Sequence, residues 1–502
     1  MGGCYRPLGS RGTPPGQPSG LAAPRRSRGK DTDTTMNQQD HIQEPEPDRP
    51  GGHRARSRRR WWAVGLAGVT GLALTTVGLA ATSAVLPGGD QTGKPTNDRP
   101  SVQEHRTDER GKRDDGKSDD PSRGDKGKDR PKGTPVPCDA DTLIAAITLA
   151  NARGGAILDL AENCTYLLSA TIDGAGLPAI TTPITLNGGK HTTIERAAAV
   201  DLFRILTVNA GGDLTLNHLT IAGGHTAAGT SGGGVLVNIG GTLTANDSAI
   251  TRNISGSNGG GILNEGTTVV TRSRVTRNLA DQVGGGIHST GRLEIVKSRV
   301  DDNTSVIGGG VLAFDVTIRG GSISGNHSTI VGGLFVQGGV GTVVGTRVIG
   351  NTANVIGGVA VAGAGQLKVR RVKIADNTAT VAGGLFVQGG GVGDSRAVVE
   401  DSAIERNTAT ATTAGGVYNA GQAVLRHTTI TDNQADLGAG IYNTDSGTLA
   451  LYSTKVVKNI AVTDGGGILN VVGGSVELNT ATGTVVVKNR PNNCVNVLGC
   501  QS

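Results

Sequence analysis

Residues 259–289 read GGGILNEGTTVVTRSRVTRNLADQVGGGIHS, so that a glycine run followed by Ile262 returns 25 residues later as a glycine run followed by Ile287. Asn278 lies between the two runs, with Val275 three residues before it and Ser273 five residues before it. The same asparagine recurs along the chain at intervals of 23 to 30 residues. Its positions are Asn253, Asn278, Asn303, Asn326, Asn351, Asn377, Asn407, Asn433, Asn459 and Asn489.

A repeat of this length predicts a solenoid. Each repeat supplies about three strands of roughly three to five residues, which are too short to fold alone. Coils stacked at a spacing of about 4.8 Å share ladder hydrogen bonds, so equivalent side chains lie one above another. The Ile/Val position then builds a continuous apolar core, and the asparagines form a structural, hydrogen-bonded column. We therefore predict an all-β fold, a right-handed parallel β-helix of about 10–12 coils.

The ends of such a stack expose strand edges and need covers. Residues 139–153 predict a short N-terminal capping helix, which Asp141 can cap and which Gly154 and Gly155 end. Leu143, Ile144, Ile147 and Ala150 would lie on one face of this helix. We expect 138–224 to hold the cap and irregular first coils, and 225–502 to hold the repeat β-helix with its C-terminal cap.

Composition and charge exclude some functions. The chain holds 82 Gly among 502 residues and only 2% aromatic residues, so its core is built from small β-branched layers. The net charge of +6 is concentrated in the N-terminal part. Residues 1–137 carry 24 Lys/Arg and 17 Asp/Glu, whereas 138–502 carry 24 and 25. A nucleic-acid partner is therefore not expected for the folded part.

The N-terminal region predicts export. We expect residues 1–60 to be a disordered basic leader, in which Met36 offers an alternative start. Arginines precede the uncharged stretch 61–86, which is typical of a signal peptide cleaved after Ala84. The alternative is an uncleaved membrane anchor, because the stretch is long enough to span a bilayer. Residues 88–137 hold 12 Lys/Arg and 11 Asp/Glu and predict a disordered charged linker.

Four cysteines follow the export segment, two at each end of the predicted fold. An even number of cysteines in an exported chain favours disulfides, and we expect the pairs Cys138–Cys164 and Cys494–Cys500. The alternative is four free thiols. The Cys and His spacing of a metal site is absent from the sequence, and we predict neither a metal nor a cofactor.

The repeat resembles those of the pectin-lyase-like superfamily of right-handed parallel β-helices. It is also similar to secreted bacterial β-helix proteins and to polymorphic outer-membrane protein repeats, whose G-G-A-I element corresponds to 259–262 and 465–468. The F-x-x-N element of those repeats differs here, because Ile or Val replaces Phe, as at Ile374. Cys138, the helix and Cys164-Thr165-Tyr166 resemble the cap of secreted β-helices. The resemblance implies the fold and leaves open lyases, hydrolases, adhesins and surface proteins.

Catalytic motifs of polygalacturonase-like relatives are incomplete in this chain. Asn443-Thr444-Asp445 and Asp301-Asp302 match two such motifs, but in reversed order and without the others. Asn443 follows a glycine corner as other repeat asparagines do, so Asp445 is interpreted as a turn residue. We therefore predict no catalytic residues; the alternative function is a polysaccharide lyase or glycoside hydrolase.

One set of cations recurs beyond what the fold requires. The position four residues before the ladder asparagine should point outward, and it holds no acid in any coil. Stacking would align its cations into a basic column, flanked by further cations two residues earlier and suited to an anionic polysaccharide or cell-wall polymer. The alternative is ordinary charge that protects sheet surfaces. The column holds Arg274, Arg299, Arg347, Lys373 and Lys455, and the flanking cations are Arg272, Lys297 and Arg371.

These features predict a secreted or cell-surface monomer with a structural, adhesive or glycan-binding role. In this interpretation the membrane is contacted only through 61–86, if that stretch stays uncleaved.

Overall fold

The computed structural model describes residues 133–390 and 393–501. The predicted leader, the signal or anchor stretch and most of the predicted linker lie outside these residues. In the described part, no helix is long and apolar enough to cross a membrane.

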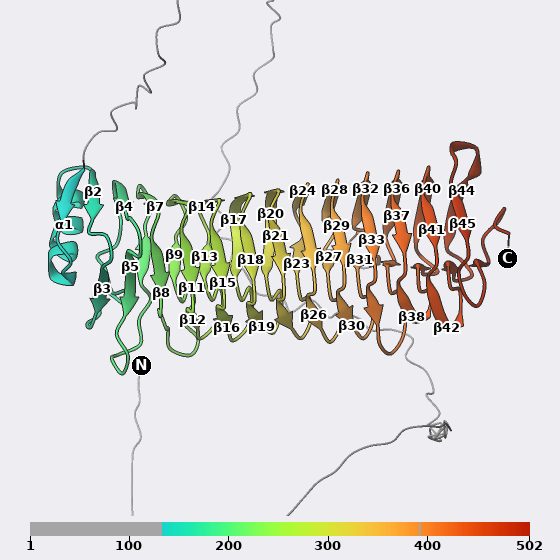
Figure 1. Cartoon of the computed structure of the whole chain (residues 1–502), viewed down its shortest axis with the longest axis horizontal. Helices are drawn as coiled ribbons and strands as arrows, with labels where there is room; N and C mark the ends of the chain where they lie inside the picture. The colour runs from blue at the N-terminus through green and yellow to red at the C-terminus, as the bar shows by residue number, and fades with distance from the viewer. Residues whose placement is uncertain (1–132, 391–392, 502) are drawn as a thin grey trace, which may run out of the picture. The chain divides into compact units, whose positions relative to one another are not determined.

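The described chain is a parallel β-helix whose coils stack along one axis (Figure 1). One coil contains β13 (Ile262–Asn264), β14 (Thr267–Thr271), β15 (Arg274–Thr276) and β16 (Leu279–Ala280). Each of these strands pairs in parallel with its equivalent in the next coil. This arrangement confirms the predicted β-helix. Its handedness remains a prediction from the sequence.

Three parallel sheets follow from this stacking. The largest has 24 strands because β17 (Ile287–Val296) and β20 (Val311–Arg319) each run through the positions of both β13 and β14. A nine-stranded sheet contains β16. The 13-stranded sheet carries the predicted basic column. Its strands are β3 (Thr165–Leu168), β5 (Thr193–Arg196), β8 (Thr220–Ala222), β11 (Ala249–Thr251), β15, β18 (Arg299–Asp301), β21 (Ser322–Ser324), β25 (Arg347–Ile349), β29 (Lys373–Ala375), β33 (Ala403–Glu405), β37 (Thr429–Thr431), β41 (Lys455–Val457) and β45 (Val485–Val487).

The predicted number of coils was too low. Thirteen strands in one sheet mean that at least thirteen coils pass through it, rather than 10–12. The extra coils include β3, β5 and β8, which pair in register with the later strands. These early coils lack the ladder asparagine, so an alignment on that residue does not count them.

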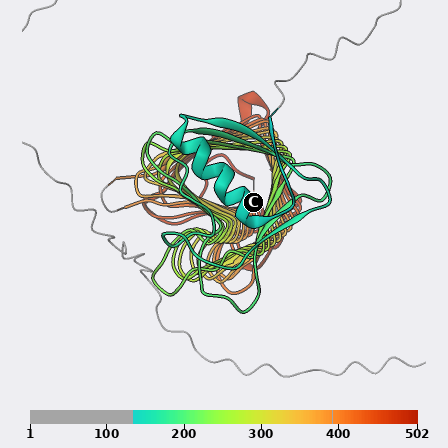
Figure 2. The same ribbon diagram turned by 90° about the vertical axis from the view of Figure 1, so that its left-hand side faces the viewer.

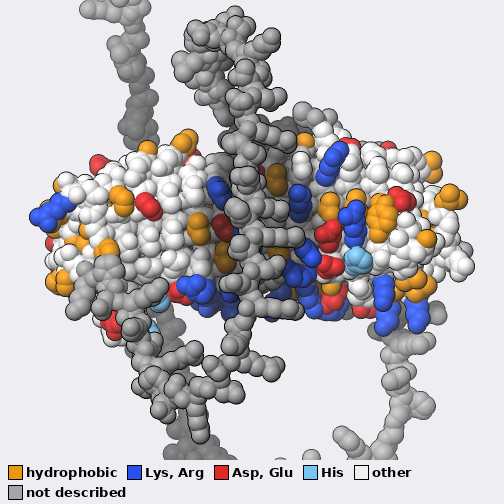
Figure 3. Space-filling view, turned by 90° about the horizontal axis from the view of Figure 1, so that it is seen from above, with side chains coloured by type: hydrophobic (Ala, Val, Ile, Leu, Met, Phe, Trp, Pro, Cys, Tyr) orange, Lys and Arg blue, Asp and Glu red, His pale blue; other side chains and the backbone are white. Residues whose placement is uncertain are grey.

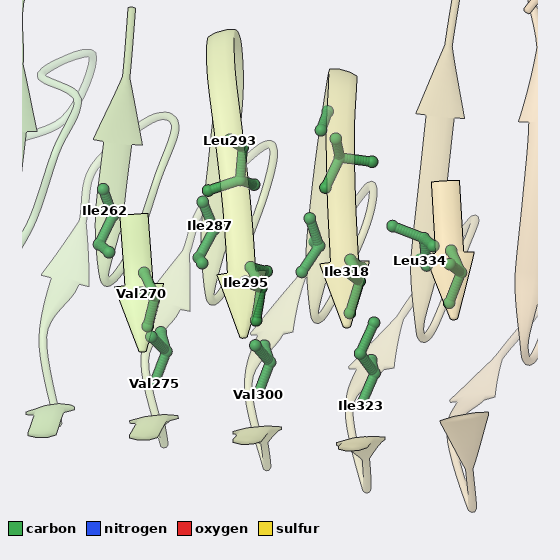
Figure 4. Packing of buried hydrophobic residues seen from close by; sticks show 14 of the residues in the cluster. Ile262, Val270, Val275, Ile287, Leu293, Ile295, Val300, Ile318, Ile323 and Leu334 are labelled. Atoms are coloured by element: carbon green, nitrogen blue, oxygen red, sulfur yellow. The ribbon is translucent and has the colours of Figure 1, made fainter. Parts of the chain in front are cut away.

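The core consists mainly of stacked aliphatic side chains from the 24-stranded and 13-stranded sheets (Figure 4). Val270 lies in register with Ile295, and Val275 with Val300, and all four are buried. Burying a side chain of this size contributes about 1.5–3 kcal/mol. The coils after Phe203 therefore each gain a similar contribution, without aromatic residues in this cluster.

The ladder asparagines are buried and connect successive coils. The backbone N–H and the side-chain Nδ2 of Asn278 both donate to Oδ1 of Asn303, each at 3.0 Å. The same Nδ2 donates back to the carbonyl of Ile250 at 3.0 Å. The residue before the ladder asparagine has a positive φ in these coils, for example 55° at Arg277 and 57° at Asp302. This corner turns the buried amide inward and the preceding side chain outward.

A second column of small hydroxyl residues supports the corner between β14 and β15. The Ser273 hydroxyl oxygen accepts from the backbone N–H of Ser248 at 3.0 Å, and Ser298 does the same for Ser273. The residue before each of these serines again has a positive φ, such as 47° at Arg272. We call this the first corner, and the corner before the ladder asparagine the second corner.

Helix α1 (Ala140–Ala152) lies across the N-terminal end of the stack (Figure 2). Leu143, Ile147 and Ala150 are buried against the first coils. The predicted cap residue was wrong. Asp139 caps the helix by accepting from the Thr142 backbone at 2.8 Å, and Asp141 lies in the first turn. The extended backbone of Asp139 directs its carboxylate to the free amides, whereas Asp141 is already helical.

The disulfides near the two ends of the stack agree with the prediction from the sequence. Cys138 is bonded to Cys164 and Cys494 to Cys500, which confirms both predicted disulfides. Regular structure is already present before the predicted boundary at residue 138. Strand β1 (Thr134–Val136) pairs with β2 (Ala156–Leu160), and Val136 is buried. This strand extends the large sheet beneath the cap.

Candidate functional site

The stacking brings the predicted cations of the 13-stranded sheet into one register. Arg274 pairs with Arg299, and Arg347 pairs with Lys373, on adjacent parallel strands. Ser322 occupies the intervening position between Arg299 and Arg347. The side chains of Arg274, Arg299 and Arg347 are exposed, and that of Lys373 is half-buried. Further along the sheet, Ala403 and Thr429 separate Lys373 from Lys455.

The three flanking cations lie at the first corner rather than on the strands. Arg272, Lys297 and Arg371 have φ values of 47°, 48° and 54°. A positive φ is unfavourable for residues with a Cβ, so these positions do not hold long cations for conformational reasons. The corner places them beside the basic column.

Acids in the neighbouring outward positions neutralise part of this charge. Arg274 Nη2 lies 3.0 Å from Asp301 Oδ2, and Lys373 Nζ lies 2.6 Å from Glu405 Oε1. Arg272 pairs with Asp247 at 2.6 Å, and this hydrogen bond lowers the pKa of Asp247. The sequence interpretation considered only the charges at the column position itself. It therefore missed these acidic partners, which lie two residues along the strand or one coil away. Basic and acidic side chains are also interspersed on the face of the molecule that Figure 3 shows.

Glu405 shows how strongly one of these acids is held. Burial tends to raise its pKa, but hydrogen bonds from Lys373 and Arg406 outweigh burial and keep the pKa below its ordinary value. Lys373 is therefore committed to an internal ion pair.

Four cations of the set have no such partner among the described residues. Arg299 and Arg347 in the column, and Lys297 and Arg371 at the first corner, form no ion pair with a described acid. Lys297 and Arg299 lie in one coil, and Arg347 and Arg371 lie two and three coils further along. Their positive potential attracts anions within about 10 Å at 0.1 M salt. The uncompensated part of the predicted site is thus this group of four.

A shallow hollow of about 290 Å³ lies at the N-terminal end of the column. Thr220 and Ala249 occupy the strand position that Arg274 fills in the next coil, and these small side chains leave the space open. His218 and Arg272 lie along its first-corner side. Asp247, which pairs with Arg272, also lines the hollow, so its charge is mixed.

The sequence interpretation missed a column of aromatic side chains. On each coil an apolar residue follows the glycine pair. The residue directly after that apolar residue points away from the core. Phe386 stacks on Tyr418 with ring centroids 5.0 Å apart, and Tyr418 stacks on Tyr442 at 5.5 Å. Phe335 occupies the equivalent position two coils earlier and is buried. The rings cover one another's faces, so this column primarily stabilises the stack. The aromatic residues share one position relative to the glycine pair, and an alignment on that pair could have revealed the column.

The apparent catalytic motifs serve the fold. Asn443 is buried in another asparagine ladder, accepting from Asn419 and donating to Asn470, each at 2.7 Å. Asp445 is exposed and accepts from the backbone of Ser446. Asp301 is paired with Arg274. Within 133–390 and 393–501, no group of three or more His, Cys, Asp or Glu residues could hold a metal ion.

Comparison with known proteins gives distant structural neighbours. No protein-family model matches the chain, and no curated protein matches its sequence. The A-module of the Azotobacter vinelandii mannuronan C-5 epimerase AlgE6 has a TM-score of 0.36 and 15% identity, covering 71% of this chain and 94% of its own. The tailspike protein of E. coli bacteriophage HK620, in complex with a pentasaccharide, has a TM-score of 0.32 and 12% identity, covering 67% and 74%. At these scores neither neighbour carries an argument about function, and membership of the pectin-lyase-like superfamily stays a prediction.

Proposed function

We propose that the chain is an exported cell-surface or extracellular protein that binds an anionic polysaccharide along its basic column and catalyses no reaction. The observation that carries the proposal is the register of Arg299 and Arg347, beside Lys297 and Arg371, on one outer surface. Equivalent positions on successive coils are separated by about 4.8 Å. Arg299 and Arg347 are two coils apart, with Ser322 between them, so their positions are separated by about 9.6 Å and a polymer lying along the column can place two acidic groups on them.

The rigidity of the surface favours this role. Ladder hydrogen bonds on both sides fix the backbone of each column residue, so little conformational entropy is lost when a polymer is bound. The two end disulfides agree with a location outside the cytoplasm. We expect the protein to act as a monomer with a structural or adhesive role.

Retention on immobilised polygalacturonate tests the proposal. The full chain with Arg299→Glu, Arg347→Glu and Arg371→Glu should lose retention at 0.1 M salt, because attraction is replaced by repulsion. The variant Arg274→Glu with Lys373→Glu should lose less, since those cations are already paired with Asp301 and Glu405.

A matched control changes the same number of charges elsewhere. Arg292 on β17, Lys368 on β28 (Gln366–Arg370) and Arg396 on β32 (Arg396–Glu400) are exposed on the 24-stranded sheet. Reversing these three should leave retention unchanged. Equal losses in both triple variants would refute the column, and release of unsaturated or reducing ends from the polymer would support the alternative lyase or hydrolase.

A further inference from the structure

We propose a second anion-binding site, separate from the basic column, in a hollow near the C-terminal end of the stack. The hollow has a volume of about 510 Å³. Lys458, Lys488 and Arg490 line it, together with Asp432 and Ile460. We infer that it takes an acidic sugar residue, held by its carboxylate or sulfate group.

The fold brings the three cations together from two sides of the asparagine ladder. Lys458 and Lys488 occupy the second corner in successive coils, with φ values of 58° and 60°. The backbone N–H of Asn459 donates to Oδ1 of Asn489 at 2.9 Å and holds the two corners in register. Arg490 directly follows Asn489 and forms a parallel bridge with Ile460. One wall of the hollow is therefore a stacked lysine pair, and the other is Ile460 and Arg490.

The charges in this hollow differ from those at the same corner in the preceding coils. Arg406 stacks beside Asp376 of the preceding coil and pairs with it at 2.8 Å. Lys458 and Lys488 are instead like charges in adjacent coils. Asp432 is the acid among the residues that line the hollow, and no ion pair joins it to these cations in the described part of the chain. The repulsion decreases when an anion enters between them.

The lining favours a sugar over a small inorganic anion. Ile460 is 48% exposed and supplies an apolar surface for the C–H face of a sugar ring. The ammonium and guanidinium groups would bind the acidic group by charge-assisted hydrogen bonds. A carboxylate and a sulfate ester share this chemistry, and separate probes distinguish them.

Footprinting of the full, unaltered chain tests the site directly. Lysine acylation followed by peptide mapping would be measured with digalacturonate, with a sulfated uronate disaccharide and with inorganic phosphate. We expect either disaccharide to protect Lys458 and Lys488 at least about threefold, while Lys368 on β28 reacts at an unchanged rate. Protection by phosphate alone would overturn the sugar assignment, and no protection by any probe would overturn the site.

Calorimetric binding of the protecting disaccharide separates this site from the proposed function. The variant Lys458→Gln, Lys488→Gln and Arg490→Gln should raise Kd at least about tenfold, because charge-assisted contacts are lost. The control Arg292→Gln, Lys368→Gln and Arg396→Gln should leave Kd unchanged. The charge-reversed variant of Arg299, Arg347 and Arg371 should keep the Lys458 and Lys488 footprint, even if polymer retention shows that the column has no role. Equal Kd values for the hollow variant and its control would refute the site.

Discussion

At the scale of the residue, the ladder asparagines are the least replaceable side chains. Asn303 is buried and uses both ends of its amide. Its Oδ1 accepts from the backbone and the side chain of Asn278, while its Nδ2 donates to Asn326 and to the carbonyl of Val275. Removing this amide leaves several buried groups in two coils without partners.

The change Asn303→Ala should therefore lower the free energy of unfolding by about 3 kcal/mol, since each unsatisfied buried group costs about 1–3 kcal/mol. Asn354→Ala is the matched control, because the side chain of Asn354 is exposed. It should cost less than about 0.5 kcal/mol. Chemical denaturation of both variants measures the difference, and similar losses would contradict the ladder's role.

His288 is a buried polar side chain in an apolar register. It lies between Leu263 and Leu312 on adjacent coils, and its Nδ1 has no hydrogen-bond partner among the described residues. Burial lowers its pKa from 6.5 to about 4. The folded protein therefore holds the neutral imidazole until the pH falls well below the range in which the unfolded chain takes up a proton.

This difference predicts a pH dependence of stability. Above pH 6.5 neither state protonates the imidazole, so the group has no effect on the pH profile there. Between pH 6.5 and about 4 the unfolded state binds the proton first, and the free energy of unfolding should fall by about 3 kcal/mol.

A leucine in place of His288 would repeat the residue type of the neighbouring coils, so His288→Leu should remove this decrease while leaving the fold intact. Denaturation curves at about pH 7 and about pH 4.5 for the wild type and for His288→Leu measure it. A parallel pH profile in the two proteins would show that His288 is not the cause.

At the scale of the element, the repeat predicted the positions of the strands far better than the contacts of the surface side chains. Val275 and Asn278 revealed the inward positions, because core packing and a buried amide must repeat in every coil. The surface positions obey no such requirement. The pairing of Arg274 with Asp301 and the ring stack of Tyr418 depend on register between coils, which becomes visible only when the steps of 23 to 30 residues are placed in space.

The cap shows a second reason for error. Asp139 and Asp141 both suit a helix start by residue type, and the choice depends on where the chain leaves β1 and the Cys138 disulfide. The early coils at β3, β5 and β8 were undercounted for a related reason, because they use other residues than asparagine at the corners. Predictions based on residue identity therefore fail where tertiary connections decide.

At the scale of the whole molecule, the coils contact mainly their neighbours, so the ends should open first. Helix α1 covers the N-terminal end. At the other end, Val476 and Leu478 of β44 (Ser475–Asn479) are only partly buried, although they face the core. In the C-terminal disulfide loop, Val497 and Cys500 are also only partly buried against the core, and Leu498 is 92% exposed.

Hydrogen exchange should reflect this asymmetry. Backbone amides of β18 and β21 should exchange most slowly, those of β5 more quickly, and those of β45 fastest, because local opening requires fewer contacts to break near an end. Mass spectrometry of peptides from the native protein measures the order. Equal protection of β5 and β45 would contradict unequal closure of the two ends.

The direction of the asparagine hydrogen bonds makes the two ends of the stack chemically different. The N–H of Asn278 donates forward to the next coil, and its side-chain amide donates back to the carbonyl of Ile250. At each ladder position the C-terminal edge of a partial stack thus presents two amide donors, the backbone N–H and one side-chain N–H, which the next asparagine satisfies. Because synthesis begins at the N-terminus, α1 and the first coils leave the ribosome before the coils that follow them. The ladder that stabilises the finished protein therefore also gives the two edges of any partial stack different hydrogen-bonding groups.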